Sequence, residues 1–534
     1  MSKSSKYKKQ VANATQKATH KATQKAKQEK RTSNIKKREV KIPSISNKPK
    51  RDALEICALI YAMWTAIVTP LWLEDQYFNQ TEAKGHAFYA GAVILLVGML
   101  ITLVYKRTIK PLIPRKDSTE ICVVAFGVLA IISSLLSEYQ EESLLGNTGW
   151  WVGGIPMLIF SIAVIFLSNT IKWDKMLCWA TMITGCIIFF LDILHSAGID
   201  TFGLHKDMLE GEVFAYLGTI GNIDWHIAYF TLTMPIIAIL FMRCKERTMT
   251  IVYGCYLFMA CMGMVLTRTD GIYVGIGLCA FFLVPYVMKN AQRLRRFLLI
   301  VGFYGVSALI VQNLPAFANV HISGGVCAFL AKPLISGAMV VAGFGGFALL
   351  YRGGKELSER FSRTATIVIE AGLACAVLFF IIQTIRTFNN DWGSGRGVIW
   401  IYTFKLFDQM SFGEKLIGLG PETLRMYNTE INEIVGGWVL TNHSDFLQLL
   451  VTNGLLGLAA WIAMWASIVV KQIKSNEIED EAFIFFICLM AYLGQSTVFT
   501  MECLCWPMLI VVMALFLRYY RERTELREED TQIS

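Results

Sequence analysis

Apolar runs about 20 residues long recur from residue 53 onward, and they decide what this chain can fold into. A helix of that length spans the hydrocarbon core of a bilayer, which is roughly 30 Å thick. Most of the runs lack the polar stripe of a helix on the surface of a soluble protein. At 54% hydrophobic residues over 534 positions, the chain is also more apolar than a typical soluble protein. The sequence therefore predicts an all-α, polytopic transmembrane helical bundle.

The apolar runs predict about 12 to 14 spans. They lie near residues 53–73, 86–105, 119–137, 149–168, 173–195, 226–243, 248–266, 270–288, 296–313, 334–351, 367–385, 443–470, 481–500 and 503–517. Basic loops such as MRCKER and KNAQRLRR alternate with acidic ones such as EDQYFNQTE. Because Lys and Arg concentrate in cytoplasmic loops, we expect both termini in the cytoplasm.

Charged tails flank the expected bundle of residues 53–517. Residues 1–51 hold 17 Lys or Arg and 2 Glu, so the rest of the chain is net acidic although the whole carries +9. We expect residues 1–52 to form a disordered, basic cytoplasmic tail. The alternative is a tail that contacts an anionic lipid surface or RNA, and no DNA partner is expected. Residues 518–534 are expected to form a second, charged cytoplasmic tail.

The 13 cysteines include no CxxC pair, and most lie inside apolar runs, where a thiol packs as a small hydrophobe. This pattern indicates neither a zinc site nor a disulfide framework. Cys327, Cys503 and Cys505 fall near expected outer loops. A bridge from Cys327 to one of the other two therefore stays open.

Two long segments, 196–225 and 386–442, connect spans on the expected outer side. Long loops on a helical scaffold commonly carry function. Six of the seven histidines also fall on this side or at an outer helix end. Within the larger segment, GVIWIYTFKLFDQM places Trp400, Phe404 and Phe407 on one helical face. That helix either lies in the membrane interface with its aromatic face in lipid or packs against the spans.

Arginine is the rare basic residue on the expected outer side. Arg268 lies in LTRTDG, a short turn between two spans, and Arg396 lies in the glycine-flanked turn WGSGRGVIW. Arg386 and Arg425 are the others. Since a guanidinium binds phosphate through paired hydrogen bonds, these positions indicate a lipid phosphate or diphosphate ligand. The alternatives are a snorkelling Arg268 or one paired with Asp270, and a solvated loop charge at Arg396.

The stretch YLGTIGNIDWHIAYFTLTMP contains a flexible polar turn at Gly221 and Asn222 that leads into a span. Such a turn can line a groove for sugar hydroxyls. An ordinary turn at the start of a helix explains the same residues equally well. His226, in the same stretch, is expected to be interfacial rather than a ligand.

The stretch LTNHSDFLQLLVTNGLLG places His443 between two residues that can start a helix. Asn442 can cap that helix, and Asp445 would then stand close to a capping box, so both are expected to be structural. Ser444 would point to another side of the helix from His443, which argues against a hydrolase-like pair because a nucleophile and its base must be within hydrogen-bond reach.

His443 itself would occupy the first turn of the helix, at the positive end of the helix dipole. That position disfavours the imidazolium, and a neutral imidazole near pH 7 can act as a general base. A histidine that only packs in the core is the alternative. A metal ion here would need ligands from distant positions such as His205 or His321, because none stands at ligand spacing nearby.

Four stretches together resemble the O-antigen ligase and polymerase superfamily of bacterial envelope glycosyltransferases. In order, they are GTIGNIDWHIAYFTLTMP, LTRTDGIYVGIGL, GSGRGVIWIYTFKLF with LIGLGPET, and NHSDFLQLLVTNGLLGL, and the last two are the most specific. They cover about residues 210–460. One departure is Asp270, two positions after Arg268, which could reduce the charge available there. Another is length, since more spans are expected than is usual in the family.

The resemblance implies a metal-independent glycosyltransferase, without a cofactor, in the bacterial inner membrane. It would move a glycan from an undecaprenyl-(di)phosphate-linked donor to a hydroxyl of a lipid or glycan acceptor at the outer face, as an O-antigen ligase or a surface polysaccharide polymerase. Arg268 and Arg396 would hold the donor phosphates, and His443 would take the acceptor proton. Further residues expected to contact substrate are Gly221, Asn222 and Arg425.

Two other functions are compatible with the sequence. One is a protein O-oligosaccharyltransferase, which belongs to the same superfamily. The other is a transporter or flippase for a lipid-linked glycan, which usually carries ionisable residues deep in the bundle. The middles of the expected spans are almost free of such residues, and Asp192 and Glu370 are expected near span ends.

Overall fold

The computed structural model describes residues 51–532 except 148, 210, 323, 354–355, 394 and 437–438. The chain divides into two units, Met1–Asp52 and Ala53–Ser534, and the second is described here. The basic segment 1–50 lies outside the described residues. Its expected disorder and its expected contacts with lipid or RNA therefore stay predictions.

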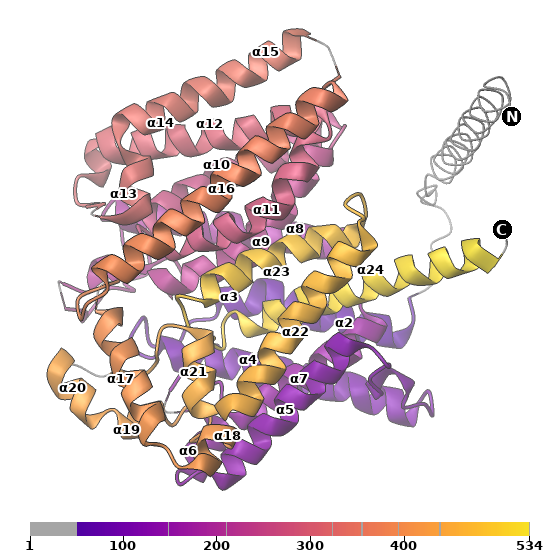
Figure 1. Ribbon diagram of the computed structural model, residues 1–534, viewed down its shortest axis with the longest axis vertical. Helices are drawn as coiled ribbons and strands as arrows, with labels where there is room; N and C mark the ends of the chain where they lie inside the picture. The colour runs from indigo at the N-terminus through magenta and orange to yellow at the C-terminus, as the bar shows by residue number, and fades with distance from the viewer. Residues whose placement is uncertain are drawn as a thin grey trace, which may run out of the picture. The chain divides into compact units, whose positions relative to one another are not determined.

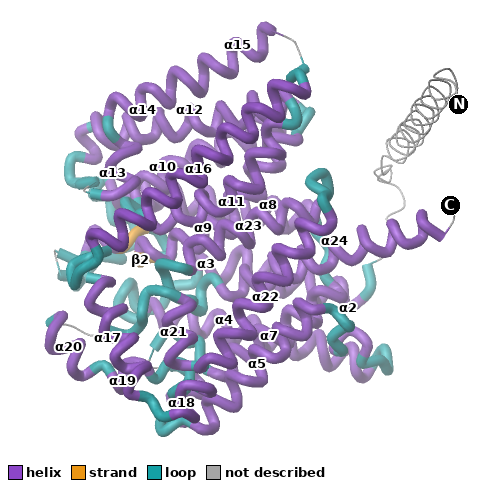
Figure 2. Tube along the Cα trace, in the orientation of Figure 1, coloured by secondary structure: helices purple, strands orange, loops and turns teal. Residues whose placement is uncertain are grey.

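The second unit is a helical bundle, as the apolar runs predict (Figure 2). Eleven helices among the described residues are long and apolar enough to cross a membrane, so the predicted all-α, multi-pass fold is confirmed. They are α2–α3 (Ala53–Leu71), α4 (Gln80–Val104), α5 (Ser118–Leu136), α8 (Lys175–Ser196), α9 (Ile223–Arg243), α10 (Arg247–Leu266), α11 (Gly271–Met288), α12 (Ala291–Asn313), α14–α15 (Pro333–Arg352), α16 (Glu359–Thr387) and α22 (Gly454–Ser475).

The remaining expected spans also form helices, but these are shorter or only partly apolar. Two are α7 (Gly154–Thr170) and α23 (Glu481–Ser496), and the last is α24 (Trp506–Gln532). The expected span at 443–470 is divided into α21 (Asp445–Thr452) and α22. The break follows from Gly454, whose φ of +65° ends the first helix before the second begins.

The core of the bundle surrounds α23, which packs against α9, α11 and α24 and buries almost every side chain. At the opposite extreme, α16 buries none of its residues and contacts the bundle mainly through α11. The α14–α15 segment, at the top of Figure 1, is almost as exposed. Apolar side chains on these peripheral helices face what would be lipid in a membrane.

Several connecting segments meet at one end of the bundle, which we call the loop end and define as residues 197–222, 267–270 and 388–444. The longest of them carries α17 (Arg396–Gln409), α18 (Phe412–Ile417), α19 (Leu424–Tyr427) and α20 (Thr429–Val435), drawn in orange at the lower left of Figure 1. In 197–222, β1 (Tyr216–Leu217) pairs antiparallel with β2 (Gly221–Asn222). The bundle thus presents its irregular segments together.

The helix α17 largely packs against its neighbours. Ile399 and Thr403 are buried, and Ile399 shares a small apolar cluster with Ile431 of α20. Phe404 alone of the predicted aromatic face stays widely exposed, at 56%. Of the two alternatives for this helix, the contacts therefore favour packing, with Phe404 available to lipid.

Residues 518–532 continue α24 as a helix, and in it Arg521 pairs with Glu120 at 2.6 Å and Arg523 with Asp480 at 2.7 Å. The cytoplasmic position expected for this charged segment stays a prediction. All 13 cysteines are free thiols, so the bridge from Cys327 does not form.

Candidate functional site

Asp224, the second residue of α9, joins three segments of the loop end, although no sequence pattern singled it out. Its Oδ2 accepts a hydrogen bond from Arg396 Nη2 at 3.1 Å, and its Oδ1 accepts one from Thr269 Oγ1 at 2.9 Å. Its own backbone N–H donates to Asn222 Oδ1 at 2.8 Å. One carboxylate thereby connects the α10–α11 turn and the start of α17 to the start of α9.

Arg396 begins α17, directly after Gly395 in the left-handed region. Besides its bond to Asp224, the guanidinium donates from Nη1 to Gly393 O at 3.1 Å. Its Nε is buried and has no hydrogen-bond partner among the described residues. An unpaired buried N–H costs free energy, so it is a group that an anionic ligand would stabilise. The solvated loop charge considered for Arg396 is not what the structure contains.

Arg268 lies in the α10–α11 turn with a φ of 55°, which is strained for a residue with a side chain. Its guanidinium donates to Phe214 O and lies over the Phe214 ring at 5.9 Å, while its Nε is buried without a partner. Burial lowers the pKa of Arg268. Asp270 turns away and accepts from Cys327 N–H at 2.9 Å. Among the described carboxylates none pairs with Arg268, so its charge is not muted by Asp270.

His443 precedes α21 and also has a left-handed backbone, with a φ of 49°. Its Nδ1 is buried and has no hydrogen-bond partner among the described residues. Burial, together with the positive charge of Arg396, lowers the pKa of His443 from its ordinary 6.5 to about 4, against the opposing effect of Asp224. His443, Arg396 and Asp224 are therefore one electrostatic cluster, in which the imidazole is neutral at pH 7.

The capping roles predicted for Asn442 and Asp445 are wrong. The helix begins at Asp445, and its N-cap, Ser444, makes no side-chain cap. Asn442 instead accepts from Thr403 Oγ1 of α17 at 2.7 Å, and Asp445 accepts from Met501 N–H at 2.5 Å. Tertiary partners thus bind one oxygen of each side chain, while Asn442 Nδ2 and Asp445 Oδ2 are buried without a hydrogen-bond partner among the described residues. His443 consequently lies outside the helix, and burial and Arg396, not the helix dipole, keep it neutral.

The hydrolase and metal alternatives gain no support from the described residues. Ser444 donates its backbone N–H to Thr500 Oγ1 at 3.1 Å and has no hydrogen bond to His443. No group of three or more His, Cys, Asp or Glu side chains within the described ranges is arranged to hold a metal ion.

The turn at Gly221 and Asn222, which was predicted to line a sugar groove, has a structural role. Gly221 has a φ of +84°, and a Cβ there would lie 1.8 Å from Gln80 Nε2, so only glycine fits. The Asn222 side chain caps α9 through the Asp224 N–H. His226, expected to be interfacial, is fully buried. The turn therefore positions Asp224, and it does so as an ordinary helix start.

Arg425, which was predicted to contact substrate, pairs with an acidic residue outside the Asp224 cluster. Its Nη2 lies 3.5 Å from Glu142 Oε2 of α6 (Gln140–Leu145). Next to this pair, Glu422 is buried with its Oε2 accepting from Trp150 N–H at 3.0 Å. These contacts hold the segment 388–444 against the α6–α7 connection. Arg425 thus anchors the loop, and its Nε is buried without a partner among the described residues, so its predicted contact with substrate stays a prediction.

Glu422 gives this anchor a pH dependence. Burial, reinforced by the neighbouring Glu142, raises the Glu422 pKa from its ordinary 4.5 to about 7. Between those values the folded protein holds a proton that the unfolded chain releases, so this contribution to stability is present below about 4.5 and is lost as pH rises through about 7.

We expect Glu422→Gln to remove that loss and to stabilise the protein above pH 7, by on the order of 3 kcal/mol. The measurement is thermal unfolding of the purified protein at pH 5 and pH 8. Glu430→Gln, at an exposed acid of the same segment that pairs with Lys405, is the matched control. If the unfolding temperature changes equally between pH 5 and pH 8 in the wild type and in Glu422→Gln, Glu422 is not the source of the pH dependence.

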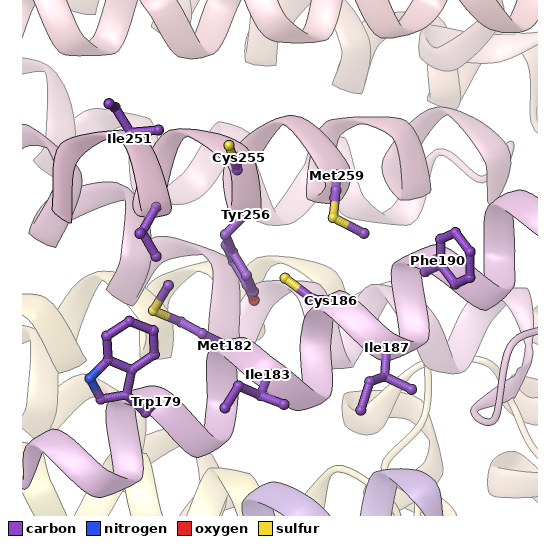
Figure 3. Close-up of a pocket in the computed structure, with 11 residues that line it drawn as sticks. Trp179, Met182, Ile183, Cys186, Ile187, Phe190, Ile251, Cys255, Tyr256 and Met259 are labelled. Atoms are coloured by element: carbon purple, nitrogen blue, oxygen red, sulfur yellow. The ribbon is translucent and has the colours of Figure 1, made fainter. Parts of the chain in front are cut away.

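An apolar groove runs between α8 and α10, with Trp179 near one end and Phe190 and Met259 near the other (Figure 3). Its volume is about 560 Å³. None of the predicted site residues lines it. The groove offers apolar contact and contains no charged side chain, unlike the Asp224 cluster.

The Asp224 cluster contains a guanidinium and a neutral imidazole, and Arg268 lies next to Thr269, which donates to Asp224. Arg268 and Arg396 each present a buried, unpaired Nε–H, and His443 presents a buried ring nitrogen with no partner among the described residues. In comparisons with protein-family models and with curated proteins, no match to the chain was found. Fold and site together define a multi-pass helical membrane protein with a cationic, base-containing site at its loop end.

Proposed function

We propose that the protein is a glycosyltransferase of the bacterial inner membrane that takes a glycan from an undecaprenyl-(di)phosphate-linked donor and attaches it to an acceptor hydroxyl at the outer face, as an O-antigen ligase or a surface polysaccharide polymerase. The observation that carries the proposal is the bond between Arg396 and Asp224, which joins residues 172 positions apart beside His443. The bond joins the first and third of the four stretches that carry the resemblance, and Arg396 acts electrostatically on His443 of the fourth.

In the proposed reaction, Arg268 and Arg396 bind the donor diphosphate. The acceptor oxygen attacks the anomeric carbon, and the bond from that carbon to the diphosphate oxygen breaks, so that the lipid diphosphate leaves with the electron pair. His443 takes the acceptor proton. The guanidinium groups balance the charge that develops on the leaving group, which is the principal electrostatic task in such a transfer. Asp224 orients Arg396 for it.

The test is to delete the gene in its host bacterium and to separate the surface glycan on a gel. Loss of polymer on an intact lipid core is expected of a ligase, whereas single repeat units on the core are expected of a polymerase. Complementation with Arg386→Ala, at an exposed arginine in the last turn of α16 and outside the cluster, should restore the polymer. An unchanged glycan in the deletion strain would contradict both activities.

A transporter of a lipid-linked glycan is the second candidate, because the described helices contain buried ionisable side chains after all. Lys84 is one, but its Nζ donates to the carbonyls of Thr69 and Pro70 and so closes the end of α3. Asp192 and His226 are two more, and they are fully buried against each other. The two functions differ in where the donor accumulates after deletion: at the outer face for a transferase, at the inner face for a transporter.

A further inference from the structure

Asp192 of α8 and His226 of α9 are in hydrogen-bond contact, with both side chains fully buried. His226 Nε2 lies 3.0 Å from Asp192 Oδ1, and Asp192 Oδ2 is buried without a hydrogen-bond partner in the described part of the chain. Taking such groups out of water is costly, and apolar residues of the same size would avoid that cost. The pair therefore calls for a role beyond packing.

The partners of His226 fix its ring. Its Nδ1 lies 3.1 Å from the backbone oxygen of Asn222, which can only accept, so Nδ1 carries a hydrogen. On the other side, the contact to Asp192 needs one more proton, either on Nε2 or on the carboxyl. In both arrangements the ring is held between two oxygen atoms and cannot turn. A histidine held in this way can orient the groups that it touches.

The groups that it touches lead directly to the cluster. Asn222, which accepts from His226, caps Asp224 with its side chain, and Asp224 in turn holds Arg396. The pair also lies close to the preceding hairpin, since a Cβ at Gly218 would be only 2.4 Å from Asp192 Oδ1. Asp192 and His226 thus contact the turn that positions Asp224.

The geometry points to Asp192 and His226 as positioning residues, which hold the first turn of α9 so that the Asp224 carboxylate keeps the Arg396 guanidinium aimed at its anionic ligand. The inference rests on the proposed function only for the nature of that ligand. Neither residue touches the ligand. They act through Asn222, the turn residue whose backbone oxygen His226 contacts. In this way they fix the position of the Arg396 guanidinium.

The first measurement needs no ligand. Hydrogen–deuterium exchange of the full-length protein in detergent, read by mass spectrometry, follows the amides of 222–227, those of 396–400 and those of α23. In His226→Gln, which cannot bridge Asn222 and Asp192 at once, we expect faster exchange in the first two segments and unchanged exchange in α23. His86→Gln, at a histidine that pairs with Glu74 on the surface, should match the wild type. Unchanged exchange in 222–227, or an equal rise in α23, would overturn the inference.

A conservative pair of variants separates positioning from folding. In Asp192→Asn the amide can still donate to His226 Nε2, so the ring keeps both contacts, whereas Asp192→Ala removes one of them. We expect the exchange of 222–227 in Asp192→Asn to stay near that of the wild type and to rise in Asp192→Ala. Exchange as fast in Asp192→Asn as in Asp192→Ala would reject the hydrogen-bond argument.

Binding of a short prenyl diphosphate in detergent then connects the pair to the site. We expect His226→Gln to weaken this binding about 10- to 100-fold, because small misplacements of a binding group are costly. One outcome is that exchange rises in 222–227 and 396–400 of His226→Gln while neither the wild type nor any variant binds the probe. That result would support the positioning role and contradict the lipid diphosphate donor of the proposed function. If the wild type binds and His226→Gln binds equally well, the positioning role falls and the donor site stands.

Discussion

Alanine in place of His443 is expected to lower the rate of glycan transfer by a factor of about 10² to 10⁴, the usual contribution of a general base. The imidazole is neutral at pH 7, and its buried Nδ1 has no partner among the described residues. Donor binding should be retained, because Arg268 and Arg396 are untouched. The measurement is the initial rate of transfer from a lipid-linked donor by purified protein, with donor affinity determined separately.

Ser444→Ala is the matched neighbour, since Ser444 holds the loop through its backbone N–H. It should retain wild-type rates, and wild-type rates in His443→Ala would remove His443 from the mechanism. The pH profile gives a second readout of the same role. Because the His443 pKa is lowered to about 4, the base stays available at pH 5, and kcat/KM should fall only as pH drops through about 4.

The second large effect is expected at Arg396. Changing Arg396 to Ala should reduce kcat/KM about 10²- to 10³-fold, as the removal of one preorganised charge-stabilising donor does in other transfer reactions. The variant also leaves the Asp224 carboxylate unpaired, which repels an anionic donor. Lysine should rescue little, because a single ammonium cannot reproduce the paired, planar hydrogen bonds of a guanidinium. The readout is the transfer assay with varied donor concentration.

The double variant Arg396→Ala with Asp224→Asn separates the two causes. If repulsion by the unpaired carboxylate contributes, the double variant should transfer faster than Arg396→Ala alone, and the difference measures the coupling of the pair. Arg386→Ala, at an exposed arginine in the last turn of α16, is the control and should resemble the wild type. Equal rates in Arg386→Ala and Arg396→Ala would exclude a specific part for Arg396.

The helices could be predicted from the sequence because a bilayer leaves the backbone few choices. Each apolar run must satisfy its own hydrogen bonds, so length and composition were sufficient to locate it. Whatever depended on partners distant in sequence was harder. Asn442 and Asp445 fit a capping pattern, yet they bind Thr403 and the Met501 backbone, and no local signal announces such contacts. Arg425 pairs with Glu142 for the same reason.

The candidate site was predicted in part. Arg268, Arg396 and His443 could be singled out because a charge or an imidazole at a membrane surface needs a reason, and the structure brings Arg396 and His443 into one cluster. Asp224 was missed because an acid in the first turn of a helix is ordinary. Asp224 lies in one of the stretches that carry the resemblance, and Arg268 and Arg396 lie in two others. A search for an acid that could pair with these arginines could therefore have found it. Asp192 was expected near a span end, but its burial against His226 depends on how two helices pack.

The left-handed backbone at Arg268 and His443 has a consequence for protein engineering. Each conformation stores on the order of 1 kcal/mol of strain that glycine would relieve. A screen for heat-resistant variants of this protein will therefore favour glycine at the two positions from which the cationic and basic side chains project. Such a screen should also select for the proposed glycan transfer, because heat resistance alone would enrich for variants that lack these two side chains.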